Sequence, residues 1–215
     1  MTSTQLRKTF KAIHPQLSQH HATRLHRALS WMDAAQQKET SEDMRFIAWW
    51  ISFNACYAIH QEAETPLPER ALFMKFLERL HELDEHQAIY GMLWNKFAGP
   101  VRILIENRFV YRPFWEAHHG KEMHWESLHR KSIEQALTFL SARDVPNLLA
   151  IVLDRLYTLR NQLMHGGATF KSRVNRKQLR DGVRILESLV PLILQVMMNH
   201  PEEDWGLVMY PHIPE

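Results

Sequence analysis

Three polar side chains with complementary chemistry, Arg160, Asn161 and His165, lie close together in this chain of 215 residues. The segment before them places apolar residues at helical spacing, and Arg160 falls on that apolar stripe, four residues after Leu156. A guanidinium on the inward side of a helix is costly to desolvate unless a carboxylate or a phosphate pairs with it. The pattern therefore predicts an arginine that binds an anion.

Asn161 and His165 are four residues apart, so they share one helix face beside Arg160. Gly166 and Gly167 follow at once and predict the end of the helix, which leaves the imidazole accessible to a ligand. Histidine side chains titrate near neutral pH and serve as general acids and bases. The three residues therefore indicate acid–base chemistry on an anionic substrate.

The same residues also admit a purely structural interpretation. In it, His165 is a capping residue and Arg160 is paired with a carboxylate of a neighbouring helix, such as Glu42 or Asp43. A helical scaffold without a ligand would then be the correct description of the protein.

A basic cluster follows the three residues, with a single acid, Asp181, among them. Its members are Lys171, Arg173, Arg176, Lys177, Arg180 and Arg184. If this cluster flanks the end of the helix, it attracts a nucleic-acid backbone through counterion release. A solvated helix face is the alternative.

The histidines His118, His119, His124 and His129 raise the question of a metal site. Gly120 interrupts any shared helical face, and no cysteine lies nearby, so we expect neither a metal site nor a cofactor. The single cysteine, Cys56, lies within a very apolar stretch and is expected to be a core residue.

Two separated motifs resemble one known family. RNQLMHGG, at 160–167, has the form Arg-Asn-x-x-x-His followed by small residues, and RALSWMDAAQQKETSEDMRFIAWWISFNACYA lies at 27–58. Both resemble prokaryotic HEPN-domain proteins with an Arg-x4-His motif, of the Apea-like or toxin-like kind. The resemblance covers about residues 24–60 and 146–199, and it implies an all-α, HEPN-like helical bundle with additional helices.

The resemblance also implies a chemistry. In this family the motif helices of two units commonly meet and form a composite, metal-independent ribonuclease centre. By this analogy His165 would be the general base or acid, Arg160 would stabilise the phosphoryl group, Asn161 would orient its neighbours, and Asn54 would support them. The RNA-binding candidates are then Lys171, Arg173, Arg176, Lys177 and Arg180.

The implied partners are RNA, a second copy of the chain in a homodimer, and an antitoxin protein in a toxin–antitoxin or antiphage defence setting. Many family members are inactive. The alternative function is therefore a catalytically silent HEPN module that binds a partner protein, a nucleotide or RNA.

The composition favours helices that position these residues within a single domain, 1–215. Hydrophobic residues make up 45% and charged residues 23% of the chain, and only seven glycines are present for tight turns. With one cysteine, no apolar leader and no apolar run of about 18 residues, the chain is expected to be cytoplasmic and not membrane-embedded. The net charge of +2 is too small to indicate nucleic-acid binding by itself.

Helical patterns and breaker residues divide the chain into expected elements. Helices are expected near 3–13, from Pro15 to about 35, over 41–60, 68–83, 87–97, 100–108, 124–142, 146–165 and 175–199. A loop is expected over 110–120 and an irregular tail over 200–215, and the middle helices at 66–143 are the least diagnostic. The two most apolar segments, 46–57 and 148–164, are expected to pack centrally against each other.

Overall fold

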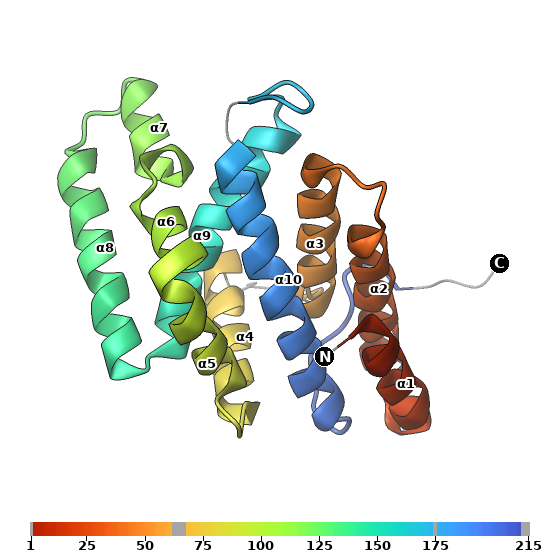
Figure 1. Cartoon of the computed structure of the whole chain (residues 1–215). Helices are drawn as coiled ribbons and strands as arrows, with labels where there is room; N and C mark the ends of the chain where they lie inside the picture. The colour runs from red at the N-terminus through yellow and green to blue at the C-terminus, as the bar shows by residue number, and fades with distance from the viewer. Residues whose placement is uncertain (1, 62–67, 174–175, 212–215) are drawn as a thin grey trace.

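The computed structural model describes residues 2–61, 68–173 and 176–211. Figure 1 shows these residues as a bundle of helices, and the predicted all-α class is confirmed. Within the described ranges the only β-type pairing is an isolated antiparallel bridge between Ile59 and Val208. None of the helices in these ranges is both long and apolar enough to cross a membrane.

The first three helices begin at side-chain caps. They are α1 (Ser3–Ile13), α2 (Gln19–Gln36) and α3 (Glu42–Tyr57). The prediction for the second start was wrong: Pro15 lies in a 3₁₀ turn, and α2 begins only where the Ser18 hydroxyl accepts a hydrogen bond from the His21 N–H. Ser41 caps α3 in the same way.

A long kinked helical segment forms the middle of the chain. After α4 (Glu69–Leu83), α5 (Ala88–Lys96) continues through a π-helical turn (Phe97–Val101) into α6 (Arg102–Glu106). The backbone at Gly99 leaves the helical region there, just before Pro100. The break that was predicted at this proline is therefore a kink within one continuous segment. Pro66, predicted to help start α4, lies outside the described residues.

The prediction of a loop over 110–120 was wrong. A 3₁₀ turn (Arg108–Val110) leads into α7 (Arg112–His118), which has a proline in its first turn, and α8 (Trp125–Ala142) follows. The Phe114 ring packs against the Trp125 ring from α8, with 4.9 Å between centroids, and its centroid lies 4.1 Å from that of the tilted His118 ring. Aromatic packing between helices thus stabilises a helix of only two turns.

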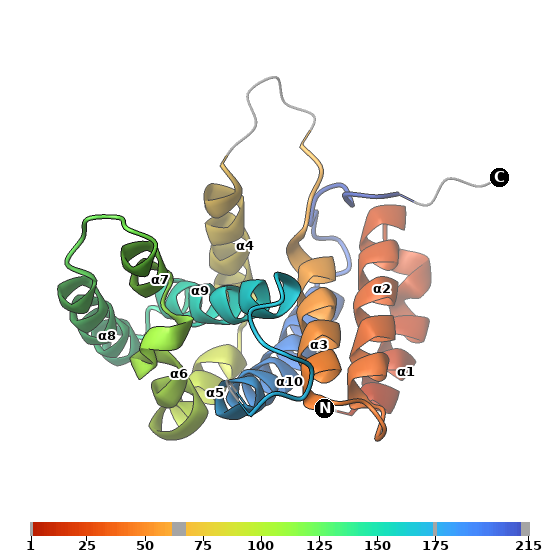
Figure 2. The same ribbon diagram turned by 90° about the horizontal axis from the view of Figure 1, so that it is seen from above.

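The two last helices, α9 (Val145–Met164) and α10 (Arg176–Asn199), complete the bundle. α3 packs mainly against α2 and α10, whereas α9 packs mainly against α4 and α8. The expected contact between 46–57 and 148–164 is present and both segments are largely buried, but it is not the main packing of either helix. α3 and α9 contact each other over a limited area, where the Trp50 and Tyr157 rings lie 6.1 Å apart. In Figure 2, α9 crosses the bundle towards α3.

The segment after α10 is irregular, as predicted, but it packs onto the bundle. Trp205 is buried, and Val208 pairs with Ile59 just beyond the end of α3. The buried Arg24 guanidinium joins the two segments by donating hydrogen bonds to five backbone carbonyl groups. These belong to Ala55, Cys56, Ala58, Trp205 and Gly206.

Candidate functional site

The predicted end of the motif helix is confirmed. Gly166 adopts φ +68°, and its N–H donates to the Leu163 carbonyl at 3.2 Å. The Gly167 N–H donates to the Gln162 carbonyl at 2.7 Å, and an added Cβ at Gly167 would lie 2.9 Å from that oxygen. The glycine pair therefore closes α9 as a left-handed helix stop. The His165 side chain is exposed at this end.

Arg160 is turned towards the side of α9 that carries Asn161. Its Nη1 donates to Asn161 Oδ1 at 2.9 Å. Asn161 shares a helix face with His165, so this hydrogen bond orients the Arg160 side chain towards the face of α9 that carries the imidazole. Arg160 is only partly buried, and not part of the core as its place on the stripe predicted, because the last turn of α9 extends beyond the core. Met164 in that turn is 55% exposed.

No described carboxylate forms an ion pair with Arg160. The two carboxylates proposed as its partners in the scaffold interpretation bind other arginines. Asp43 accepts two hydrogen bonds from Arg176, at 2.7 and 3.2 Å, and Glu42 accepts one from Arg180 Nε at 3.1 Å. The pairing of Arg160 with Glu42 or Asp43, which would have favoured the scaffold interpretation, is therefore not formed.

The ion pair between Asp43 and Arg176 fixes the loop at 166–173 to the start of α3. Arg176 Nε also donates to the Ser172 carbonyl at 3.0 Å. Burial alone would raise the pKa of Asp43, but hydrogen bonds and charge from Arg176, with backbone N–H groups that include that of Lys171, bring it below its ordinary value. The carboxylate is thus a charged anchor for the loop.

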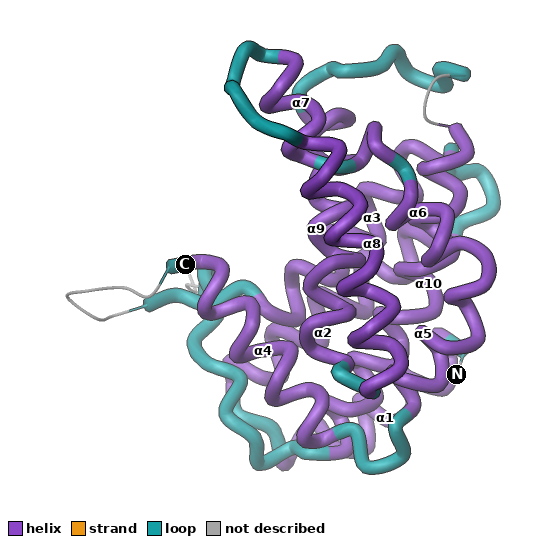
Figure 3. The backbone as a smooth tube through the Cα atoms, turned by 90° about the vertical axis from the view of Figure 1, so that its left-hand side faces the viewer, coloured by secondary structure: helices purple, strands orange, loops and turns teal. Residues whose placement is uncertain are grey.

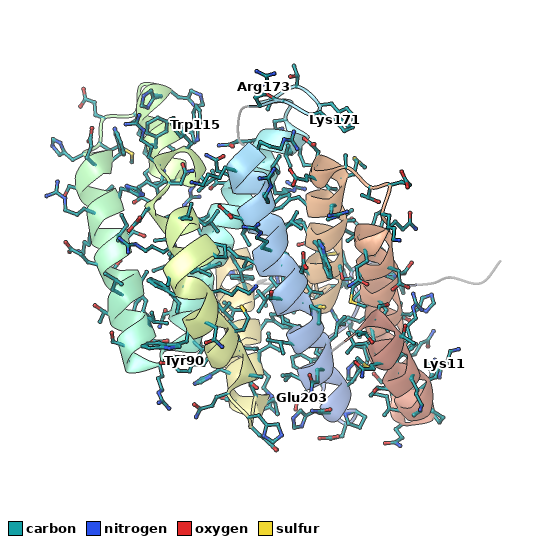
Figure 4. All side chains as sticks on the ribbon, viewed as in Figure 1. Lys11, Tyr90, Trp115, Lys171, Arg173 and Glu203 are labelled. Atoms are coloured by element: carbon teal, nitrogen blue, oxygen red, sulfur yellow. The ribbon has the colours of Figure 1, made fainter. Side chains whose placement is uncertain are left out.

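The predicted RNA-binding residues consequently divide into two groups. Arg176 and Arg180 hold the loop and α10 against α3 through their ion pairs. Lys171, Arg173 and Lys177 are exposed, and no ion pair is recorded for them among the residues that the structure describes. Figure 4 labels Lys171 and Arg173, which lie at the same end of the bundle as Trp115. We call Lys171, Arg173 and Lys177 the free basic group.

Asn54, which was predicted to support Arg160, Asn161 and His165, lies apart from the loop at 166–173. It lies in the last turn of α3, and 11 residues of helix separate it from Asp43, a distance of roughly 16 Å along the axis. Its Oδ1 atom is buried without a hydrogen-bond partner. The structure therefore places Asn54 towards the opposite end of α3 from the loop.

Sequence reasoning missed a neighbouring segment, the 3₁₀ turn that contains Arg108 and Phe109. The Phe109 carbonyl accepts hydrogen bonds from Gln162 Nε2 at 2.5 Å and from Trp115 Nε1 at 2.8 Å. Figure 3 shows α7 and the loop after α9 at the same end of the bundle. The signal in the sequence was the dense alternation of basic and aromatic residues in RFVYRPFW, at 108–115.

The histidine-rich segment forms local contacts. His118 Nδ1 lies 2.7 Å from the Phe114 carbonyl, and His129 Nε2 lies 3.2 Å from the Ile105 carbonyl. Across the described parts of the chain, no three His, Cys, Asp or Glu side chains are grouped as metal ligands. Cys56 is fully buried as predicted, and burial raises the pKa of its thiol to about 12, which makes it unsuited to be a nucleophile.

One end of the bundle thus combines an accessible imidazole at His165, the guanidinium of Arg160 and the free basic group. Arg160 and His165 come from α9, and the basic residues come from the loop that follows it and from the start of α10. A scan against protein-family models, a search of curated proteins and a search of solved structures each found no match to this chain.

Proposed function

We propose that this protein is a metal-independent endoribonuclease of the HEPN type, with its chemistry at Arg160, Asn161 and His165. The observation that carries the proposal is the hydrogen bond from Arg160 to Asn161, which directs an arginine without a described carboxylate partner towards the face of His165. The motif resemblance supports the same assignment.

The reaction follows from the groups present. His165 acts as general base and takes the proton of a ribose 2′-OH, and the 2′-oxygen then attacks the adjacent phosphorus. The bond from phosphorus to the 5′-oxygen breaks, and a general acid protonates that oxygen. The products are a 2′,3′-cyclic phosphate and a 5′-OH.

Arg160 stabilises the negative charge that develops on the phosphoryl oxygens, since a planar guanidinium donates to two oxygens at once. It supplies the positive charge that a divalent ion would otherwise bring. Asn161 holds the guanidinium through its Oδ1 atom and leaves its amide N–H groups for the phosphate or the imidazole.

A second copy of the chain supplies the second proton-transfer group. Each copy carries one His165, and the reaction needs both a base and an acid. A homodimer in which the two α9 ends face each other across a two-fold axis provides two imidazoles and two guanidinium groups in one composite site. By the same resemblance the protein acts in a toxin–antitoxin or antiphage defence setting with an antitoxin protein as partner, and its single cysteine favours the cytoplasm as its compartment.

Cleavage of RNA in the presence of EDTA tests this function. We expect the wild type to produce 2′,3′-cyclic phosphate ends, and Arg160→Ala and His165→Ala each to abolish cleavage without changing far-UV circular dichroism or the melting temperature. The matched controls are Arg130→Ala and His81→Ala, which remove exposed side chains of the same types on α8 and α4. Both controls should cleave like the wild type.

Three results would contradict the proposal in different ways. If activity is lost in EDTA and restored by Mg²⁺ or Zn²⁺, the mechanism is wrong. If Arg160→Ala and His165→Ala unfold, these residues are structural. If the wild type binds RNA, a nucleotide or a partner protein but never cleaves RNA, the protein is a catalytically silent module.

A further inference from the structure

Two aromatic side chains are exposed at the end of the bundle that carries Arg160 and His165. Phe109, in the turn before α7, is 39% exposed, and Phe170, in the loop after α9, is 65% exposed. Neither ring was assigned a role by the sequence motif. Phe109 is attached to α9 through Gln162, whereas the loop of Phe170 is attached to α3 through Asp43. The two rings therefore come from separate segments, one bonded to the last turns of α9 and the other in the loop that follows α9.

Each of these rings has a cation beside it. The Arg108 guanidinium lies 5.0 Å from the centroid of the Phe109 ring, and Lys171 Nζ lies 5.3 Å from the centroid of the Phe170 ring. Arg108 also lies 5.8 Å from the Phe114 ring, which keeps its side chain over this aromatic group. A ring next to a cation offers a stacking surface for a nucleobase and a positive charge for its phosphate.

The Phe109 platform is held rigidly. Its carbonyl accepts two side-chain hydrogen bonds, from Gln162 and Trp115, and its N–H donates to Asn107 Oδ1 at 2.9 Å. Gln162 lies between Arg160 and His165 in the chain, so the platform is connected directly to the last turns of α9. A base stacked on Phe109 is therefore held near the groups proposed to act on RNA.

The Phe170 platform is held by the loop contacts. The Ser172 N–H donates to the Thr169 carbonyl at 2.9 Å, which closes a turn around Phe170 and Lys171. The Ser172 carbonyl accepts from Arg176, which is itself bound to Asp43. These contacts order the backbone of the loop while the Phe170 ring remains in solvent.

We propose that Phe109 and Phe170 are two base-stacking subsites near the end of α9, and that they select unpaired RNA. This inference rests on the proposed function, because it takes the Arg160–His165 end as the place of cleavage. A base in a duplex is already stacked on its neighbours and paired, so it must be extruded before a protein ring can stack on it. Every base has a flat π face, so the two rings distinguish single strands from duplexes without a strong sequence preference.

Equilibrium binding in a His165→Ala background tests the subsites apart from cleavage. The probes are a fluorescein-labelled ten-nucleotide oligoadenylate, the same strand paired with oligouridylate, and a ten-unit abasic strand. We expect the oligoadenylate to bind most tightly. Phe109→Leu and Phe170→Leu, which keep an apolar side chain but remove the ring, should each weaken its binding by about tenfold. Phe109→Trp and Phe170→Trp should restore it.

Tyr210→Leu is the matched control. Tyr210 is 78% exposed and follows Val208, which pairs with Ile59 beyond the far end of α3, so its removal should leave binding unchanged. Equal affinity for the three probes, or leucine variants that bind like the control, would overturn the two subsites. If the ring variants lose binding while the wild type does not cleave RNA, the subsites stand and the ribonuclease proposal fails. If the wild type cleaves RNA and the ring variants bind normally, the ribonuclease proposal stands and the two subsites fail.

Discussion

Two arginines in the interior show how this fold accommodates buried charge. Arg24 donates to five carbonyl groups, and Arg155 donates to Ser132 Oγ at 2.8 Å and to Asp154 at 3.1 Å while its guanidinium lies 4.3 Å from the Tyr111 ring centroid. Burial lowers the pKa of both guanidinium groups. Their dense hydrogen bonding offsets this desolvation. Arg160 is only partly buried and has a single described side-chain partner, Asn161, so it has donors left for a ligand.

His21 is a buried residue whose protonation is predicted to destabilise the fold. Both ring nitrogens are buried, and the backbone of Pro201, which acts to raise the pKa, does not outweigh this burial. Burial is the largest cause that lowers its pKa below the ordinary value of 6.5, and the charge of Arg24 lowers it further. As the pH falls below 6.5, the unfolded chain binds the proton before the folded chain does, so the free energy of unfolding decreases.

Urea unfolding at pH 7.5 and pH 5.5 measures this effect. The wild type should lose stability at the lower pH, and His21→Phe should lose less, because phenylalanine fills the site without titrating. Burial also lowers the pKa of His129, which is unchanged in the variant, so the difference between the two proteins isolates His21. Equal losses in both proteins would show that His21 does not titrate in this way.

At the scale of the helices, Gly182 of α10 lies in close contact with two neighbouring helices. An added Cβ at this position would lie 2.8 Å from Phe46 Cε2 of α3 and 3.2 Å from Leu156 Cδ2 of α9. The helices α3, α9 and α10 therefore meet where one residue has no side chain. A glycine is unfavourable inside a helix by about 1 kcal/mol, so packing is the reason for its position here.

Gly182→Ala should therefore destabilise the protein by about 1–3 kcal/mol, although alanine has the higher helix propensity. The matched variant is Gly91→Ala in α5, where an added Cβ has no neighbouring atom within 4 Å. Gly91→Ala should stabilise the protein by about 0.5–1 kcal/mol. Chemical denaturation measures both changes. If both substitutions change the free energy of unfolding in the same direction, packing around Gly182 does not determine the effect of Gly182→Ala.

At the scale of the whole molecule, the two ends of α3 carry different structures. The loop at 166–173 and the free basic group lie at its N-terminal end, and the segment at 204–208 closes its C-terminal end through Arg24. Three basic side chains without a described ion pair thus lie at the end that also holds His165. The other two predicted RNA-binding residues, Arg176 and Arg180, form ion pairs with carboxylates of α3 and contribute to the stability of the fold.

Replacing Lys171, Arg173 and Lys177 with glutamine should weaken RNA binding and flatten its salt dependence. The slope of log K against log salt for a single strand should fall by roughly 2, since each phosphate contact contributes about 0.7. Cleavage at saturating RNA should be preserved, because these side chains guide the backbone and take no part in proton transfer. Arg176→Gln should instead lower the melting temperature. An unchanged salt slope in the triple variant would exclude the free basic group as an RNA contact.

The composite site makes activity depend on association of two chains. Sedimentation equilibrium should show a homodimer, and specific activity should fall on dilution below its dissociation constant. A mixture of Arg160→Ala and His165→Ala chains should regain part of the activity if both residues of one site come from different copies. A fully active monomer would exclude the composite site.

Local signals in the sequence were sufficient to predict most helices and the end of α9. Ser41 and Asp144 cap their helices, and Gly166 stops α9, because each of these groups bonds to backbone atoms only a few residues away. The contact between Arg160 and Asn161 was predictable for the same reason, since both lie in the last turns of α9. The failure at 110–120 occurred where packing against α8, not local propensity, stabilises α7.

Only the tertiary structure decided which helices meet and which charges are paired. Asp43 and Arg176 are 133 residues apart in the chain, and no periodicity connects them. Their ion pair determines that Arg176 holds the loop while Lys171 and Arg173 face solvent, and that Arg160 is without these carboxylates. The contact between Gln162 and Phe109 likewise spans 53 residues. Helix formation depends on neighbouring residues, whereas burial and ion pairing depend on the packing of distant ones, and so the sequence alone determined the motif and the fold determined its surroundings.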